Sequence, residues 1–257
     1  MIEVNGISKT FELSKQQRKE NNTSDRTAIA VDDISFKCES GRIFSLLGPN
    51  GAGKTTTLRM LAGILSPTSG SILINNYDIQ KESAEAKKHM GFLTGSTGLY
   101  ERLTPNEIIQ YFGRLYGVKD EEIEERKESL YTLLDMHDFQ SKRIGRLSTG
   151  MKQKVSICRT MIHDPEVVIF DEPTSGLDVI TAENIIALIK DCKSKGKTVI
   201  FSSHIMSEVD LLCDDLAIIH KGKMIFNDTM QSFRDQMVAE NLTAEFIRII
   251  NEAKAQS

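Results

Sequence analysis

One glycine-rich segment limits the possible folds of this chain more than any other feature. It reads Gly48-Pro-Asn-Gly-Ala-Gly-Lys-Thr55, follows a largely apolar predicted strand from Arg42 to Leu47 and precedes a helical pattern that ends near Gly63. It matches G-x-x-x-x-G-K-[ST], in which the glycines let backbone N–H groups curl around phosphate oxygens. The next helix presents its partly positive N-terminus to the same anion. A strand, this loop and a helix in that order predict a nucleotide phosphate site.

Two side chains of this segment have separate predicted tasks. Lys54 places a compact cation against the β and γ phosphates, and the Thr55 hydroxyl can ligate Mg²⁺, the expected cofactor. The nucleotide-binding residues predicted here are Gly48, Pro49, Asn50, Gly51, Ala52, Gly53, Lys54, Thr55 and Thr56.

An acidic pair ends a second apolar run, Val167 to Phe170. Ligands gather at the carboxyl ends of parallel strands, which is where Asp171 and Glu172 would emerge. Asp171 is the candidate Mg²⁺ ligand, directly or through water, and Glu172 is the candidate base that polarises a water for attack on the γ-phosphate. An acidic pair alone could simply end a strand, but the upstream phosphate loop favours the catalytic interpretation.

Short β-rich runs alternate with helical patterns along the chain, which predicts an α/β fold with a largely parallel sheet. The predicted strands are Arg42 to Leu47, Ser71 to Ile74, Met90 to Thr94, Val167 to Phe170, Thr198 to Ser203, Leu216 to Ile219 and Met224 to Asn227. The runs at 167–170 and 198–201 are continuously apolar, as expected of central strands buried on both faces.

The strand pattern disappears between Leu99 and Arg146, where we expect an inserted helical lobe. Thr104-Pro-Asn-Glu107 has the form of a capping box with proline at the first helical position. The next apolar residues recur at helical spacing: Ile108, Tyr111, Phe112 and Leu115. The segment 12–27 is almost devoid of apolar residues and predicts a solvated loop or long hairpin tip. The tail from Met230 onward predicts packed C-terminal helices.

Composition excludes several classes of protein. No apolar run approaches the roughly 18 residues of a membrane-spanning helix. The start of the chain lacks the basic and apolar stretches of a signal peptide, so we expect a cytoplasmic protein. The net charge is −4 with Lys and Arg scattered, which predicts no nucleic-acid partner. The four cysteines form no C-x-x-C pair and predict reduced thiols rather than a zinc site: Cys38, Cys158, Cys192 and Cys213.

Together these residues resemble the ABC ATPase family, and the resemblance extends from Ile2 to about Asp228. Further matching features occur in the family's order: Leu147-Ser-Thr-Gly-Met151 at the signature motif, Ser175-Gly-Leu-Asp178 at the D-loop, His204 at the switch histidine, Phe11 at the aromatic residue that stacks on adenine, and Gly95 to Leu99 in the Q-loop region. The resemblance implies a P-loop NTPase (RecA-like) core, an N-terminal antiparallel β region and an inserted α-helical lobe.

The resemblance also implies how the site is completed. Ser148 and Gly150 begin a helical pattern and would offer a second set of N–H groups and a hydroxyl to an anion. In the family, the signature of one protomer covers ATP held by the other in a head-to-tail dimer, and the D-loop crosses the interface. Ser148, Gly150 and Asp178 are therefore the expected contacts to the partner's ATP. His204 is the expected sensor and stabiliser of the γ-phosphate.

Three positions depart from the family pattern. Gly95 stands where the family usually has glutamine, so no side chain there can touch Mg²⁺ or the attacking water. Another residue or water fills that place, or hydrolysis is slow. Thr149 and Met151 replace a common glycine and glutamine in the signature but leave Ser148 and Gly150 unchanged.

The resemblance predicts an ATP-hydrolysing subunit that powers export through a separate transmembrane permease, as a homodimer or as a heterodimer with a second ABC ATPase. The stretch Gly95 to Thr104 and the signature variant are most similar to ATPases of bacterial ABC-2-type exporters, including those of sodium-efflux systems. The expected location is peripheral, on the inner face of the cell membrane. The alternative is a non-transport ABC ATPase, such as a cluster-assembly ATPase. A GTPase or kinase is disfavoured because the signature and D-loop would have no task.

The predicted domains are an ATPase domain over residues 1–228 and a C-terminal helical tail over residues 229–257. Within the ATPase domain, the catalytic core comprises residues 1–94 and 155–228, and the helical lobe comprises about 95–154.

Overall fold

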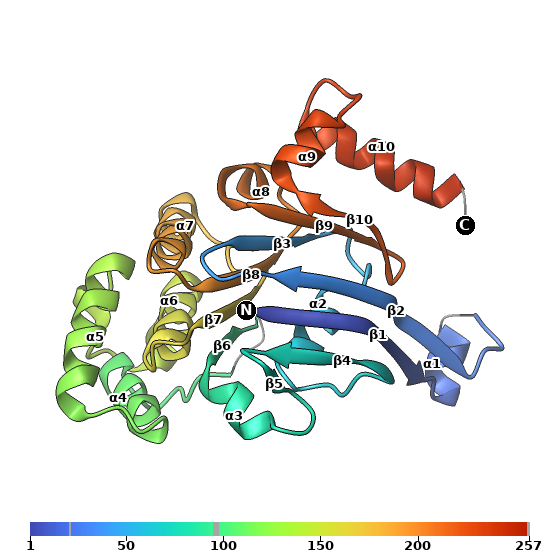
Figure 1. The fold of residues 1–257 in the computed structure, drawn as a ribbon. Helices are drawn as coiled ribbons and strands as arrows, with labels where there is room; N and C mark the ends of the chain where they lie inside the picture. Colours follow the sequence, from blue (N-terminus) through green and yellow to red (C-terminus); the bar gives the residue numbers. More distant parts are fainter. Residues whose placement is uncertain (21, 95–97, 256–257) are drawn as a thin grey trace.

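The computed structural model describes residues 1–20, 22–94 and 98–255 of the 257-residue chain. Its strands form two sheets, one antiparallel and one largely parallel, with helix α2 between them and further helices outside the larger sheet (Figure 1). This arrangement confirms the predicted α/β fold and the N-terminal antiparallel region.

The smaller sheet has the strand order β2-β1-β4-β5 and is antiparallel throughout. Its strands are β1 (Ile2–Glu12), β2 (Thr27–Cys38), β4 (Ser69–Ile74) and β5 (Tyr77–Asp78). β1 and β2 pair out to Glu12 and Thr27, so the polar segment between them is a hairpin tip, as predicted. The tip contains a short helix, α1 (Lys15–Glu20), that the sequence did not predict.

The larger sheet has the order β10-β9-β3-β8-β7-β6, and only β10 is antiparallel to its neighbour. Its strands are β3 (Ile43–Leu47), β6 (Met90–Leu93), β7 (Val167–Asp171), β8 (Thr198–Ser203), β9 (Asp215–His220) and β10 (Lys223–Thr229). Each lies where the sequence predicted a strand, within a residue or two at the ends. The parallel strands bring the carboxyl ends of β3, β7 and β8 to one edge of the sheet.

Both faces of the larger sheet are buried. Along β7 and β8, Val168, Phe170 and Phe201 belong to one hydrophobic cluster, shared with the outer helices. Ile169 and Ile200 alternate with them and belong to a second cluster, shared with α2 and the smaller sheet. Successive side chains of a strand point to opposite faces, so a sheet covered on both sides requires continuous apolar strands. The prediction of central strands is confirmed.

Helices occupy the segment between β6 and β7, as predicted. They are α4 (Pro105–Leu115), α5 (Asp120–Leu134), two short 3-10 helices (His137–Phe139 and Ile144–Arg146) and α6 (Thr149–Met161). The Thr104 side chain accepts a hydrogen bond from the Glu107 amide, while the Glu107 carboxylate accepts one from the Thr104 amide, which confirms the predicted capping box.

The remaining helices are α2 (Lys54–Leu61), α3 (Ser83–Lys88), α7 (Val179–Ser194), α8 (Met206–Leu212), α9 (Met230–Asp235) and α10 (Leu242–Ala255). The last two confirm the predicted packed helices after Met230. The boundary predicted between residues 154 and 155 falls inside α6, which packs against both α4 and β6. The division into a core, a lobe and a tail stays a prediction.

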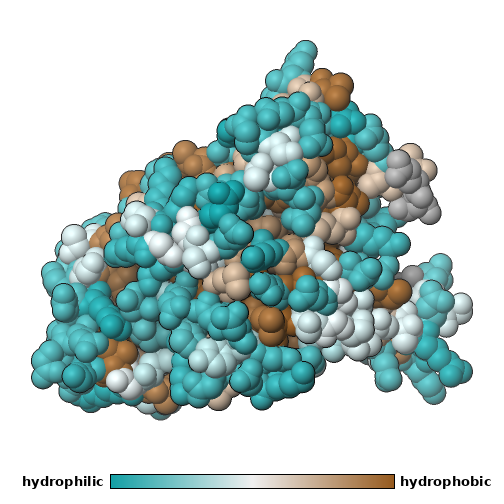
Figure 2. All heavy atoms as spheres, viewed as in Figure 1, coloured by the Kyte–Doolittle hydropathy of each residue, from teal (hydrophilic) through white to brown (hydrophobic). Residues whose placement is uncertain are grey.

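On the face shown in Figure 2, hydrophobic residues lie in separate patches among polar ones. None of the helices that the structure describes combines the length and apolar character needed to cross a bilayer. The cysteines are free thiols, three of them buried and Cys213 half-buried. Burial raises the pKa of the Cys192 thiol to about 12, which keeps it protonated and unreactive at neutral pH.

Candidate functional site

The glycine-rich loop connects β3 to α2, and two of its glycines have no room for a side chain. A Cβ on Gly48 would lie 2.3 Å from the carbonyl oxygen of Ile219 in β9. A Cβ on Gly53 would lie 2.6 Å from the carbonyl oxygen of Ala30 in β2, and Gly53 has φ +109°. Only glycine tolerates both the close backbone approach and this left-handed conformation. The loop is therefore fixed by strands of both sheets.

A cleft of about 160 Å³ opens over this loop. Its lining residues are Ala30, Asn50, Gly51, Ala52, Gly53, Lys54, Thr55, Thr56 and Glu172. All the loop residues named from the sequence line it except Gly48 and Pro49, whose carbonyl oxygens accept hydrogen bonds from Lys54 Nζ at 2.7 and 3.3 Å. Because α2 begins at Lys54, its free N–H groups and its partial positive charge suit a bound phosphate.

Lys54 is the buried cation of the cleft, with only 5% of its surface exposed. Its Nζ lies 3.6 Å from Glu172 Oε1. Burial lowers the pKa of the Lys54 ammonium, and the nearby Glu172 partly offsets this shift. The ion pair joins two residues that the sequence placed separately, one in the loop and one at the end of β7.

Asp171 and Thr55 meet at the edge of the sheet. The Thr55 hydroxyl donates a hydrogen bond to Asp171 Oδ1 at 3.1 Å, and the Asp171 side chain is buried. The hydroxyl of Ser202, at the end of the neighbouring strand β8, donates to the same oxygen at 2.7 Å. The parallel register pairs Asp171 with Ser202 and so places these groups together.

These oxygen groups fit Mg²⁺. The ion takes hard oxygen ligands and is commonly bound by one or two protein groups together with phosphate oxygens and water. Thr55 and Asp171 supply a hydroxyl and a carboxylate beside the phosphate loop. Across the described ranges, no cluster of three or more His, Cys, Asp or Glu residues could hold a metal by itself. A metal at this edge would therefore rely on the nucleotide for its other ligands.

Glu172 occupies a constrained turn directly after β7. Its φ is +48°, a left-handed conformation that non-glycine residues rarely adopt. Its amide donates to the hydroxyl oxygen of Ser202 at 3.0 Å and to the carbonyl oxygen of Ser202 at 3.2 Å. The turn directs the Glu172 carboxylate toward the cleft, where His204 Nδ1 lies 3.4 Å from its Oε1. Lys54, Glu172 and His204 thus form one chain of contacts.

Ser202 is a residue of this site that the sequence did not single out. Its hydroxyl connects the Asp171 carboxylate to the Glu172 amide, and its side chain is fully buried. A serine two residues before His204 was the only available signal. Its task depends on the register between β7 and β8, which periodicity does not give.

Phe11 lies in β1 with 36% of its surface exposed. It pairs with Ala28 of β2, and directly paired residues point to the same face of a sheet. Ala30, which lines the cleft, lies two residues further along β2, where the pairing with β1 shifts register between Lys9 and Thr10. Lys9 Nζ lies 5.3 Å from the centre of the Phe11 ring. An exposed ring on the strand that pairs with β2, the strand that contributes Ala30 to the cleft, is suited to stack on a flat base.

The signature and D-loop residues lie together, away from the cleft of their own chain. The Ser148 side chain caps α6 by accepting a hydrogen bond from the Met151 amide at 3.3 Å. Asp178 caps α7, and its carboxylate accepts hydrogen bonds from the amide and hydroxyl of Thr181, which lower its pKa. A Cβ on Gly150 would lie 3.2 Å from Thr181 Oγ1. None of Ser148, Gly150 and Asp178 is among the residues that line the phosphate cleft.

Gly95, the departure in the Q-loop region, lies outside the described residues.

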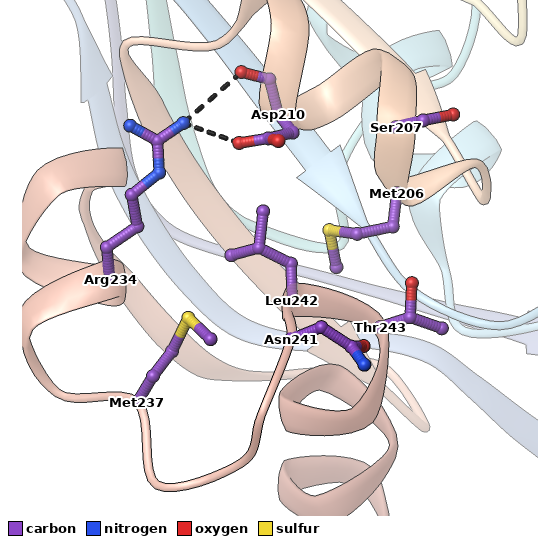
Figure 3. Close-up of a pocket in the computed structure, with 8 residues that line it drawn as sticks. All are labelled: Met206, Ser207, Asp210, Arg234, Met237, Asn241, Leu242 and Thr243. Carbon is purple, nitrogen blue, oxygen red and sulfur yellow. Dashed lines mark hydrogen bonds and ion pairs between the residues drawn. The ribbon is translucent and has the colours of Figure 1, made fainter.

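A larger groove, of about 660 Å³, lies elsewhere, between α8 and the C-terminal helices (Figure 3). Its lining residues are Met206, Ser207, Asp210, Arg234, Met237, Asn241, Leu242 and Thr243. An ion pair between Asp210 and Arg234 joins α8 to α9 at its side. The groove contains none of the phosphate-binding or acidic residues described above.

Comparisons with known proteins agree with this geometry. Residues 31–175 match the family described as ABC transporter. The chain is 42% identical to the ABC transporter ATP-binding protein NatA of Bacillus subtilis (strain 168) over 96% of this chain and 97% of that protein. It is 36% identical to the linearmycin resistance ATP-binding protein LnrL of the same organism, over 87% of this chain and 72% of that protein.

Solved structures share the fold. A structure of the ATP binding subunit of an ABC transporter has a TM-score of 0.84 and 27% identity, covering 97% of this chain and 99% of that one. A dimeric structure of a bacterial ABC transporter cassette has a TM-score of 0.78 at 23% identity, covering 90% of this chain and 99% of that one.

Proposed function

This chain belongs to the ABC transporter family, and we propose that it is the ATP-hydrolysing subunit that powers export through a separate membrane subunit. It converts ATP and water to ADP and phosphate. The proposal rests on the contact chain Lys54–Glu172–His204 and the Thr55–Asp171 pair, beside a cleft that the glycine-rich loop lines.

Binding of the nucleotide follows from the cleft. The N–H groups of residues 50–56, which include the start of α2, would surround the β and γ phosphates, and Lys54 would leave its carbonyl partners to contact them. Thr55 and Asp171 would hold Mg²⁺, which would supply positive charge against the phosphates. Phe11 would stack on the adenine ring.

Hydrolysis requires a base and a group that stabilises the γ-phosphate while it is transferred to water. Glu172 would orient a water and accept its proton, because its carboxylate is fixed at the cleft by the turn after β7. His204 would contact the γ-phosphate from the end of β8, where it also reaches Glu172. Water attacks phosphorus, the bond to the β-phosphate oxygen breaks, and ADP leaves with that electron pair.

A second protomer would complete the site. Ser148 and Gly150 at the start of α6, together with Asp178, lie outside the cleft of their own chain. In a head-to-tail dimer these residues of each protomer would cover the ATP of the other. Two copies of this chain, or one copy and a related ATPase, would satisfy this geometry.

The transported substrate is a finer proposal. The resemblance noted from the sequence favours sodium efflux, whereas the names of two relatives refer to linearmycin resistance and to Nod factor export. Such diversity among related ATPases fits a motor whose membrane partner, and not the motor itself, contacts the cargo. We place this chain at the inner face of the membrane, held there by that partner.

The direct test is Mg²⁺-dependent ATP turnover by the purified chain and by a Lys54→Ala variant. Lys37, an exposed lysine of β2, provides the matched control as Lys37→Ala. Loss of the Lys54 cation removes a charged partner of the phosphates, so turnover should fall at least about tenfold. Lys37→Ala should behave as wild type, and chelation of Mg²⁺ should stop turnover. Turnover at the wild-type rate by Lys54→Ala would refute the proposed site.

Coupling to transport needs a second experiment. The chain is expressed with and without a candidate membrane subunit encoded by a neighbouring gene, and membranes are collected. We expect the chain to sediment with membranes only when that subunit is present. Sedimentation independent of every such subunit would contradict a transport role.

A further inference from the structure

Glu208, in the first turn of α8, contacts both segments that carry the proposed catalytic groups. The Thr174 hydroxyl donates a hydrogen bond to Glu208 Oε1 at 2.6 Å. The Ser203 hydroxyl donates to the other carboxylate oxygen, Oε2, at 3.0 Å. Thr174 follows Glu172 by two residues, and Ser203 directly precedes His204. One side chain therefore connects the turn after β7 to the end of β8.

These contacts are shielded from solvent. Thr174 and Ser203 are 6% and 3% exposed, and Glu208 is half-buried. Hydrogen bonds from hydroxyls to a carboxylate are short and strong, and shielding strengthens them further. Ser203 is also fixed on its other side, because its oxygen accepts a hydrogen bond from the Ile205 amide at 3.0 Å. The hydrogen bonds from Thr174 and Ser203 to Glu208 thus have little freedom to reorganise.

The segment after Glu172 has few other anchors of this kind. The Glu172 amide itself donates a hydrogen bond to the Ser202 hydroxyl oxygen of β8. In the segment that follows, the Pro173 carbonyl oxygen accepts a hydrogen bond from the Gln153 side chain of α6 at 3.0 Å. Glu208 adds the contact that ties the same turn to the residue before His204. A left-handed residue such as Glu172 persists only when its surroundings fix it.

We propose that Glu208 is a positioning residue for ATP hydrolysis, which holds Thr174 and Ser203 so that Glu172 and His204 keep their mutual geometry at the γ-phosphate. This inference rests on the proposed function. Glu208 itself does not line the phosphate cleft, so its effect should appear in turnover and not in nucleotide binding. An acidic residue in the first turn of a helix also stabilises that helix, and the test must separate the two effects.

The variants are Glu208→Ala, Glu208→Gln and Thr174→Val, with Asp210→Ala as the matched control. Asp210 is a carboxylate of the same helix that pairs with Arg234 on the groove side (Figure 3). Steady-state kcat and KM for ATP, equilibrium ATP binding and thermal unfolding are measured for each.

Glu208→Ala should lower kcat between about tenfold and a hundredfold, since small displacements of catalytic groups are costly, while KM and ATP affinity stay within about twofold. Glu208→Gln keeps one oxygen acceptor and should recover part of the loss. Asp210→Ala should keep the wild-type kcat. Wild-type kcat in folded Glu208→Ala, or an equal loss in Asp210→Ala, would overturn the proposal.

Hydrogen exchange gives a readout that does not depend on turnover. Peptides covering residues 171–178 and 200–206 should exchange faster in Glu208→Ala, while a peptide covering 48–56 should not change. If Glu208→Ala does not fold, Thr174→Val decides: unchanged kcat and exchange there would also overturn the proposal. A wild-type chain without Mg²⁺-dependent turnover would instead refute the proposed function, and exchange would still show whether Glu208 fixes the two segments.

Discussion

Individual residues of the phosphate loop differ in how strictly they must be glycine. Gly53 combines φ +109° with a backbone carbonyl 2.6 Å from the position of its missing Cβ. Gly51 has φ +79° but no atom within 4 Å of that position. A side chain at Gly51 would strain only the local backbone, whereas one at Gly53 would also push β2 away from the loop.

Gly53→Ala should therefore be much more harmful than Gly51→Ala. We expect Gly51→Ala to cost about 1 kcal/mol of stability and to retain ATP binding. Gly53→Ala should weaken ATP binding at least about tenfold, because the loop must move to relieve the collision. Titration with a fluorescent ATP analogue, together with chemical unfolding, measures both effects. Equal ATP affinities in the two variants would show that contact with Ala30 does not set the loop's shape.

The sequence predicts site residues most readily where the chemistry requires residues close together in the chain. The glycines, Lys54 and Thr55 are contiguous, and Asp171 and Glu172 are adjacent, so the structure brings together groups already visible as motifs. Ser202 and Glu208 were missed. A serine or a glutamate has many ordinary roles, and these two acquire theirs only through the pairing of β7 with β8 and the packing of α8.

Helices and strands could be predicted from the sequence where they bury an apolar face. The strands of the larger sheet were predicted because both their faces are apolar. Helix α1 was missed because its residues are all polar and none is buried, so no apolar periodicity marks it. Strands β1 and β2 were expected only from the family resemblance, since their bulged register interrupts the alternation of polar and apolar residues.

The junction between the helices after β6 and the larger sheet contains a histidine suited to a test. His163, just after α6, stacks on Tyr116 with ring centres 3.8 Å apart, and its Nε2 lies 3.2 Å from the Met90 carbonyl oxygen. Burial lowers the pKa of His163 from 6.5 to about 4, and Lys197 and Arg126 add to the shift while the Met90 contact and Asp164 oppose it. The folded protein therefore keeps this ring neutral.

This shift predicts that stability falls as the pH drops from 6.5 toward 4. In that window the unfolded chain binds a proton at His163 that the folded chain does not, so acid favours unfolding by at most roughly 3 kcal/mol. Above pH 6.5 the contribution is fully present, and below pH 4 the loss is complete. His163→Phe keeps a ring against Tyr116 but cannot titrate.

Urea unfolding at several pH values, followed by circular dichroism because the chain has no tryptophan, compares the two proteins. The free energy of unfolding should decline less steeply with acid in His163→Phe. An identical decline in both proteins would assign the pH dependence to other groups.

At the scale of the whole molecule, the proposed ATP site would take residues from two protomers. The phosphate loop, Asp171, Glu172 and His204 meet at one edge of the larger sheet, but Ser148 and Gly150 begin α6 elsewhere and line no part of that cleft. The sequence could indicate that the start of α6 lies away from the phosphate cleft only through the family resemblance. Spacing along the chain does not tell how far apart two such segments lie in the fold. The proposed function therefore depends on a second protomer.

We propose that Glu172 drives hydrolysis of ATP that is enclosed between two protomers. The decisive experiment compares ATP turnover and light scattering for wild type, Glu172→Gln and the double variant Glu172→Gln with Gly150→Asp. The amide keeps the shape of the glutamate but cannot act as a base, so turnover should fall at least about a hundredfold. With ATP and Mg²⁺, Glu172→Gln should have the mass of a dimer, and without ATP that of a monomer.

The double variant should remain monomeric in ATP, because a side chain at Gly150 would meet Thr181 and a carboxylate would repel the partner's phosphates. Wild-type turnover by Glu172→Gln, or a dimer that forms equally with and without ATP, would contradict the account.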